Sequence, residues 1–190
     1  MAIMETTTEH IRDNIYKTLM SPIWQMDKVD QCPHRKWNDL VICYRYKIDD
    51  ERCALITKEI ADQLEMTEED LYQESKTDHV MIQGMFDVLT ACGCEYTGGG
   101  SENFLVVNPN TMHGASSILN EKEFKEKVKA DCYLIPSSIH EWLLLNPAVI
   151  DTDSVKEMVK SVNNSEVDPK DRLSYNVYWY DAVNGMITIL

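Results

Sequence analysis

The sequence predicts an α+β fold, built as a single domain with a mainly antiparallel sheet and helices packed on it. Residues 40–48 alternate with a period of two in residue types that favour strands. Polar residues that commonly cap helices precede amphipathic stretches near 121–130 and 152–162. Two strand-like runs near the C-terminus flank Asn184-Gly185, a dipeptide typical of a tight hairpin. Strands joined by hairpins are antiparallel, and separate helices then cover the sheet.

The first third of the chain is expected to begin with a helix. Residues 9–20 carry Ile11, Ile15 and Leu19 at intervals of four, so residues 1–30 are predicted as an N-terminal helical segment and residues 31–190 as the single α+β domain. The strand at 40–48 is expected to pair with residues 53–57. Two helices should follow before residue 78, the second opened by Thr67 with Asp70 three residues on, as in a capping box.

The remaining elements follow the same signals. Residues 80–92 fit a helix or a strand, and we expect a helix, followed by a loop and then a hairpin of residues 104–108 and 115–119. Asn120 should cap a helix, and residues 132–136 should form a strand. Ser138 is followed three residues later by Glu141, which predicts a capped helix leading into the apolar run at 142–145.

The charge of the chain favours a protein partner. Thirty-two acidic residues against eighteen basic ones give a formal net charge of −14, so a nucleic acid or an anionic membrane would be repelled. A basic protein, including one that binds nucleic acid, would be attracted. Seven acids and no base lie between residues 59 and 74 and are the candidate binding residues, unless they form only a solvated helix face. They are Glu59, Asp62, Glu65, Glu68, Glu69, Asp70 and Glu74.

Neither the N-terminus nor the cysteines indicate export or a metal. The first residues lack a basic region followed by an apolar one, and no apolar run approaches the roughly 20 residues of a membrane span, so we expect a cytoplasmic protein. Six scattered cysteines are expected to be free thiols. The spacers in Cys32-Pro-His34 and Cys92-Gly-Cys94 are too short for a zinc knuckle, and the glycines at 98–100 lack the rest of a phosphate loop. No cofactor or metal is predicted, and the oligomeric state is left open.

One short stretch contains residue types used in catalysis. His140-Glu141 begins as a zinc-protease motif does, but the second histidine would stand at position 144, which is Leu144. Ser137, Ser138, His140 and Glu141 are the candidates for a hydrolase site, although neighbours in sequence seldom form a triad because their side chains diverge. His113 or Asp131 would be better partners if folding brought them close. The leading prediction is therefore a non-enzymatic binding protein, and the alternative is a hydrolase.

Five segments carry a family resemblance: residues 32–48, 56–76, 113–119, 131–145 and 162–181. Their order and spacing resemble the C-terminal part of a family of gut-bacterial, clostridial proteins of unknown function, from about residue 30 onward. The run Pro-Ser-Ser-Ile-His-Glu at 136–141 is the most recognisable motif. The resemblance implies membership and no activity. Because family members are longer at the N-terminus, we expect a specialised variant, carried on a mobile element and inhibiting a host defence protein that processes nucleic acid.

Overall fold

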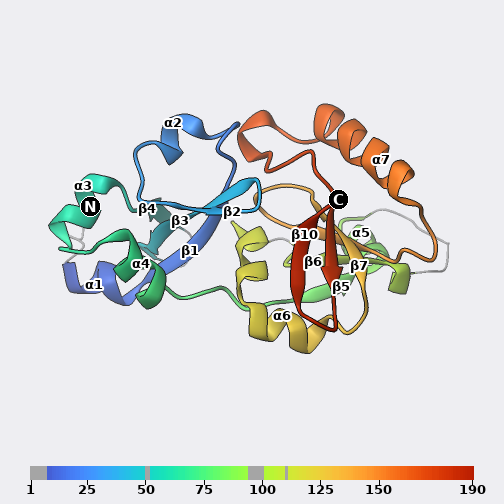
Figure 1. The fold of residues 1–190 in the computed structure, drawn as a ribbon, viewed down its shortest axis with the longest axis horizontal. Coiled ribbons are helices and arrows are strands. Elements are labelled where there is room, and N and C mark those ends of the chain that lie inside the picture. The colour runs from blue at the N-terminus through green and yellow to red at the C-terminus, as the bar shows by residue number, and fades with distance from the viewer. Residues whose placement is uncertain (1–7, 50–51, 94–100, 110) are drawn as a thin grey trace. The chain divides into compact units, whose positions relative to one another are not determined.

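The computed structural model describes residues 8–49, 52–93, 101–109 and 111–190. Its internal contacts divide the chain into two compact units, Met1–Asp78 and His79–Leu190. Each unit contains one sheet with antiparallel strand pairing, together with helices, so the predicted α+β class is confirmed (Figure 1). The division into an N-terminal helical segment of residues 1–30 and a single α+β domain of residues 31–190 stays a prediction. No helix among the described residues is long and apolar enough to cross a membrane.

The sheet of the first unit is organised around β3 (Leu40–Lys47). This strand pairs with β1 (Ile15–Met20) on one side and with β2 (Arg35–Trp37) and β4 (Cys53–Leu55) on the other. The first six residues of β3 are buried, so both of its faces are covered. The helices of this unit are α1 (Thr8–Asp13), α2 (Met26–Val29), α3 (Lys58–Gln63) and α4 (Glu68–Glu74). The predicted strand, its partner and the two helices after it are thus confirmed.

The helix predicted for residues 9–20 is wrong in its second half. Helix α1 ends at Asp13, and residues 15–20 form β1, in which every residue pairs with one of β3. Ile15 and Leu19 are both 1% exposed. Their spacing of four fits one helix face. Pairing with β3, however, gives hydrogen-bond partners to the backbone of this six-residue strand and buries the same side chains. Tertiary pairing therefore overrides the local period.

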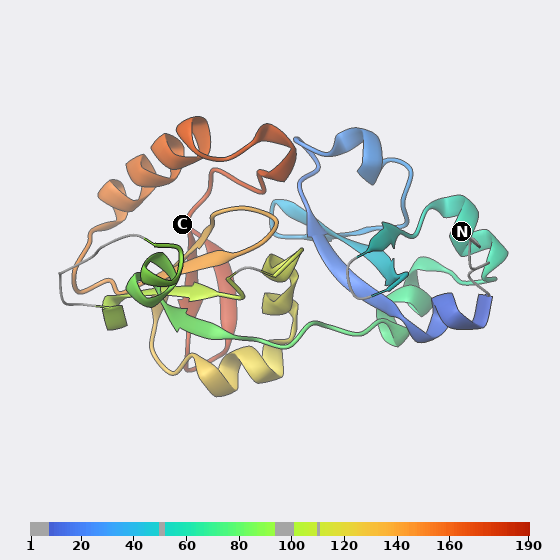
Figure 2. The same ribbon diagram turned by 180° about the vertical axis from the view of Figure 1, so that it is seen from behind.

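The second unit has a six-stranded sheet in the order β10-β9-β7-β8-β6-β5. Its strands are β5 (Ile82–Gly84), β6 (Phe104–Val107), β7 (Cys132–Pro136), β8 (Trp142–Leu145), β9 (Tyr178–Asp181) and β10 (Met186–Ile189). Its helical elements are α5 (Met85–Ala91), η1 (Ser101–Asn103), η2 (Gly114–Leu119), α6 (Glu121–Lys127), α7 (Thr152–Ser165) and η3 (Pro169–Asp171). Helices α6 and α7 lie on opposite sides of this sheet (Figure 2).

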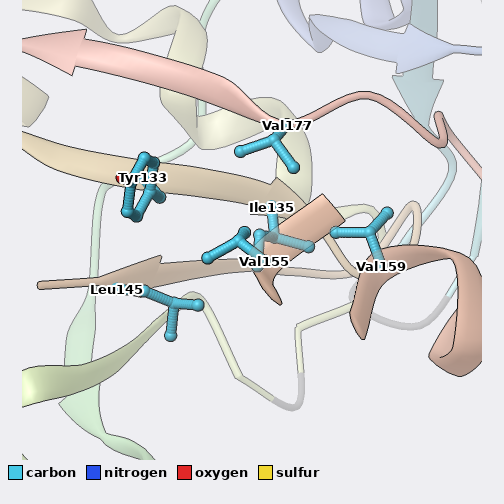
Figure 3. Packing of buried hydrophobic residues seen from close by; sticks show 6 residues of the cluster. All are labelled: Tyr133, Ile135, Leu145, Val155, Val159 and Val177. Carbon is cyan, nitrogen blue, oxygen red and sulfur yellow. The ribbon is translucent and has the colours of Figure 1, made fainter. Parts of the chain in front are cut away.

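Each face of this sheet has its own core. On the side of α7, Val155 and Val159 pack against Tyr133, Ile135 and other buried side chains of the strands (Figure 3). These residues alternate with those of the other face, as successive side chains of a strand do. On that other face, the ring of Phe124 in α6 meets Tyr180 edge-on, with 5.0 Å between centroids.

Two predicted elements of the second unit are wrong. Residues 142–145 form β8, paired with β7 on one side and β6 on the other, and not a helix. Because a strand inside a sheet is buried on both faces, its continuous apolar run does not differ from that of a buried helix. Residues 115–119, predicted as a strand, belong to the 3-10 helix η2, so the predicted hairpin with β6 is absent. Only part of the stretch 80–92 is helical, since β5 precedes α5.

The capping predictions hold elsewhere. Thr67 and Asp70 form both hydrogen bonds of a capping box at α4, and the Asn120 side chain accepts from the N–H of Glu123 at α6. The hairpin of β9 and β10 is confirmed, and Gly185 takes the positive φ of 72° that its turn requires. These local signals were reliable because the interacting groups are close in sequence.

Asn108, just after β6, shapes the start of the second unit. It is 1% exposed and has a left-handed φ of 52°. Its side-chain oxygen accepts from the N–H of Met81 at 2.6 Å, and its side-chain N–H donates to the carbonyl of His79 at 2.8 Å. One amide therefore satisfies backbone groups of a neighbouring segment as a strand would.

Candidate functional site

The seven predicted acids lie on α3, on α4 and on the turn between them. All are exposed except Glu68, which is half-buried. They therefore share two adjoining helices, and their contacts separate them into two groups.

Glu68 belongs to the first group, because it is held inside the unit. Its carboxylate accepts hydrogen bonds from Arg35 at 2.7 and 2.6 Å and another from the hydroxyl of Tyr44. The bond from Arg35 holds the pKa of Glu68 below its usual value. Burial, and next the bond to Glu68, raises the pKa of the Tyr44 hydroxyl. The same guanidinium stacks on the ring of Tyr72, 3.6 Å from its centroid.

Glu69 and Asp70 are also engaged. Glu69 accepts from Gln73 and from Arg35, each at 2.7 Å. Asp70 accepts from the backbone N–H of Thr67 at 2.8 Å, and the hydrogen bond from the Thr67 hydroxyl is the largest cause of its lowered pKa. Glu69 thus joins α4 to Arg35 of β2, and Asp70 stabilises the first turn of α4.

The remaining four acids form the second group. Within the described part of the chain, none of their carboxylates makes an ion pair or a side-chain hydrogen bond, and all four are exposed. They are Glu59, Asp62, Glu65 and Glu74, which we call the free acids. Glu65 stands between the two helices with a left-handed φ of 54°. The free acids therefore present charges to solvent that no neighbouring cation offsets directly.

The sequence reasoning missed Arg35 and Tyr44, which decide this division. They lie 33 and 24 residues away from Glu68 in sequence. Arg35 stands in a short basic run and Tyr44 in a strand, and neither pattern indicates which residue the side chain contacts. The alternating pattern was the one available signal, since it placed Tyr44 in the strand predicted for residues 40–48.

The other candidate, residues 137–141, is the loop of the β7–β8 hairpin. Ser138 accepts a hydrogen bond from the N–H of His140 through its hydroxyl at 3.0 Å, a local turn bond. Ser137 approaches Glu141 through its hydroxyl at 3.5 Å. The capped helix predicted at Ser138 is replaced by this turn, so the serine has a structural hydrogen bond of a different kind.

Folding brings His113 to this loop, as the sequence reasoning allowed, and its backbone contacts His140. Its backbone N–H donates to Nδ1 of His140 at 3.3 Å, and the two rings are 6.2 Å apart. Burial raises the pKa of Glu141. Neither Ser137 nor Ser138 hydrogen-bonds to the ring of His140 in the part of the chain that the structure describes.

Asp131, the other suggested partner, is engaged elsewhere, since its side chain accepts from the N–H of Ala182. The loop instead makes backbone contacts with two distant segments. Ile139 donates to the carbonyl of Asp171 at 2.8 Å and accepts from Ala115 at 3.3 Å. Three segments that carry the family resemblance thus meet here, held together by backbone hydrogen bonds.

The cysteines and a cavity of the second unit are the other places where a metal or a substrate could be held. Among the described residues, no cluster of three or more His, Cys, Asp or Glu could hold a metal ion. Cys32 is buried in the core of the first unit, while Cys94 and the glycines at 98–100 lie outside the described residues. A cavity of about 490 Å³ in the second unit is lined by apolar side chains such as Leu105 and Leu144 and also by Asp131, but by none of residues 137–141.

The fold and these contacts define an α+β protein with an exposed acidic surface and, in its described part, no assembled triad at residues 137–141. The chain belongs to the family of unknown function DUF5688, whose model matches residues 3–182. Membership of a family of unknown function is therefore confirmed, and the match begins well before residue 30. No curated protein and no solved structure matches the chain.

Proposed function

We propose that this protein is a non-enzymatic binding protein that uses the free acids, Glu59, Asp62, Glu65 and Glu74, to contact a basic protein. The observation that supports this is the division of the acidic surface: three carboxylates stabilise the fold, and these four are exposed without a cationic partner in the described structure. Unpaired surface charges of one sign favour association with a surface of the opposite sign.

The partner class follows from the charge. A formal net charge of −14 steers a basic protein towards this surface and repels nucleic acid. Carboxylates along two adjoining helices imitate the spaced charges of a phosphate backbone. We therefore propose a partner that processes nucleic acid, such as a host defence protein, which the chain would inhibit by occupying its basic groove. The carriage of such an inhibitor on a mobile element stays a prediction.

A cytoplasmic location is part of the same proposal. Cys32, Cys43 and Cys132 are buried free thiols, and burial raises the pKa values of Cys43 and Cys132 to about 12. Thiols that stay protonated are poor nucleophiles. Cysteines without disulfides are typical of a reducing compartment. The proposed partner, a basic enzyme that processes nucleic acid, would be present in the same compartment.

The alternative hydrolase has less support. The Ser138 hydroxyl is used in a turn bond with the backbone N–H of His140, and neither serine hydrogen-bonds to the His140 ring in the described structure. A direct check is to assay ester and peptide hydrolysis with His140→Ala. We expect no turnover above background for either the wild type or the variant. An activity of the wild type that His140→Ala abolishes would instead support the hydrolase.

The test of the binding proposal compares two variants of equal charge. The first replaces the free acids by their amides. The second makes the same change at four exposed acids of the second unit, so each variant loses four of the negative charges that make up the net −14. The control acids are Glu121, Glu126, Glu157 and Glu166.

Each protein is immobilised and exposed to lysate of a related bacterium at low and high salt, and captured proteins are identified by mass spectrometry. We expect the wild type and the control to capture the same stoichiometric basic protein, with affinity falling on the order of tenfold as salt rises. The free-acid variant should lose this capture. An equal loss of capture in both variants would show that net charge, and not this surface, drives binding, and full capture by the free-acid variant would contradict the proposal.

A further inference from the structure

The last strand, β10, leaves one backbone edge of the second unit's sheet open. It pairs with β9 on one side, and no strand of the described residues lies on its other side. The N–H of Leu190 donates to the carbonyl of Val177 across this ladder at 3.0 Å. Because backbone groups of an antiparallel strand point alternately to either side, those of Ile187 and Ile189 point away from β9.

This edge lacks the usual protection against strand pairing. Natural edge strands carry charges, proline or bulges that discourage a second strand. Residues 182–190 contain no charged residue and no proline. Apolar side chains are nonetheless exposed: Met186 is 58%, Ile189 39% and Leu190 44% accessible. In a chain of net charge −14, this uncharged strip is a place where two copies approach each other with little local repulsion.

We propose that β10 pairs in antiparallel fashion with β10 of a second copy, about a two-fold axis that passes through Thr188. The outward backbone groups fix this register. They belong to Ile187 and Ile189, so hydrogen bonding is complete when Ile187 faces Ile189 of the second copy, and the reverse. Four backbone hydrogen bonds result, and the two six-stranded sheets become continuous.

The same register matches the side chains. Residues that face each other across an antiparallel pair lie on the same side of the sheet. Met186 then faces Leu190 of the second copy, and Ile187 faces Ile189, so each exposed apolar side chain gains an apolar neighbour. The contact is narrow compared with the interfaces of permanent dimers, so the association is concentration-dependent. A second copy suits an isologous contact because the strip is complementary to itself.

The first test measures the oligomeric state by sedimentation over a range of protein concentrations, in salt high enough to screen the net charge. We expect a reversible monomer–dimer equilibrium for the wild type. Ile189→Lys should weaken it at least tenfold by placing two like charges in the pairing strip. The matched control is Val183→Lys, which adds the same charge at a residue 82% exposed in the turn before β10 and should dimerise as the wild type does.

The second test fixes the register and does not depend on a disruptive change. At the axis, Thr188 faces its own copy in a non-hydrogen-bonded pair, with Cα atoms roughly 4.5 Å apart, within the range of a disulfide. Thr188→Cys should therefore give a covalent dimer on mild oxidation. Met186→Cys should not, because the two substituted positions would be roughly 14 Å apart. Both are made with Cys92→Ser, Cys53→Ser and Cys94→Ser, so that the introduced cysteine is compared without these thiols.

Either of two results would overturn the proposal. One is a wild-type protein that stays monomeric at every concentration, which would leave the edge open to some other strand or to none. The other is equal cross-linking of the two cysteine variants, which would exclude the two-fold register.

Discussion

The division of the acidic surface makes a quantitative prediction about Glu68 and Glu74. Both are acids of α4, but Glu68 accepts from Arg35 and Tyr44, whereas Glu74 is exposed. We predict that Glu68→Ala destabilises the first unit strongly and that Glu74→Ala, the matched control, does not. Both changes remove a glutamate side chain from α4, from its first residue and its last.

The magnitude follows from the contacts. The side chains of Arg35 and Glu68 are 28% and 30% exposed, so their ion pair contributes only about 1 kcal/mol. Tyr44 is 0% exposed, and leaving its hydroxyl without an acceptor costs about 1–3 kcal/mol. Glu68→Ala should therefore lower the free energy of unfolding by about 2–4 kcal/mol. Glu74→Ala should stay within about 0.5 kcal/mol of the wild type.

The assay is urea unfolding followed by circular dichroism, with hydrogen exchange of the β3 amides to report on the first unit alone. Tyr44→Phe supplies a second check. In the Glu68→Ala background this change removes the unpaired hydroxyl, so the double variant should be more stable than the sum of the single effects by about 1 kcal/mol or more. Equal stability of Glu68→Ala and Glu74→Ala would refute the division of the acids.

Three further predictions concern the second unit. Glu141→Gln should stabilise the protein at pH 7, because burial raises the pKa of Glu141 in the fold and disfavours its carboxylate; the gain should shrink as the pH falls through that pKa and vanish below the unfolded value of about 4.3, as urea unfolding at several pH values would show. Gly114→Ala should cost about 1–3 kcal/mol in thermal unfolding, since a Cβ there would lie 2.5 Å from the carbonyl oxygen of His140; a neutral outcome would mean that the β7–β8 loop moves freely. Val155→Ala should lower the free energy of unfolding by about 2 kcal/mol in the same assay, because this side chain of α7 is 0% exposed and packs on the sheet. An unchanged midpoint would contradict the packing in Figure 3.

The sequence reasoning succeeded where the decisive contacts are local. The capping box at Thr67, the cap at Asn120 and the turn at Gly185 each involve groups within a few residues of one another. It failed at Ile15–Met20 and Trp142–Leu145, where pairing with distant strands decides the structure. Short apolar runs do not reveal such partners.

The candidate site followed the same rule. The acidic stretch was visible in the sequence as a run of like charges. The sequence did not reveal which of these acids lack a partner, because Arg35 contacts Glu68 and Glu69 only once β2 and α4 have packed together. The exposed edge at β10 was equally hidden, since the hairpin signal predicts the strand without saying which side of it stays open.

The backbone conformation and hydrogen bonds at position 108 restrict which amino acids can replace Asn108. Aspartate tolerates the left-handed backbone but has no N–H to give to the carbonyl of His79. Glycine fits the backbone and offers neither bond, while alanine fails on both counts. Other members of the family that keep this turn should therefore show asparagine here, although the residue touches no acidic or hydrolase candidate. An invariant asparagine at this place would record how the chain is folded, and reading it as a catalytic group would be a mistake.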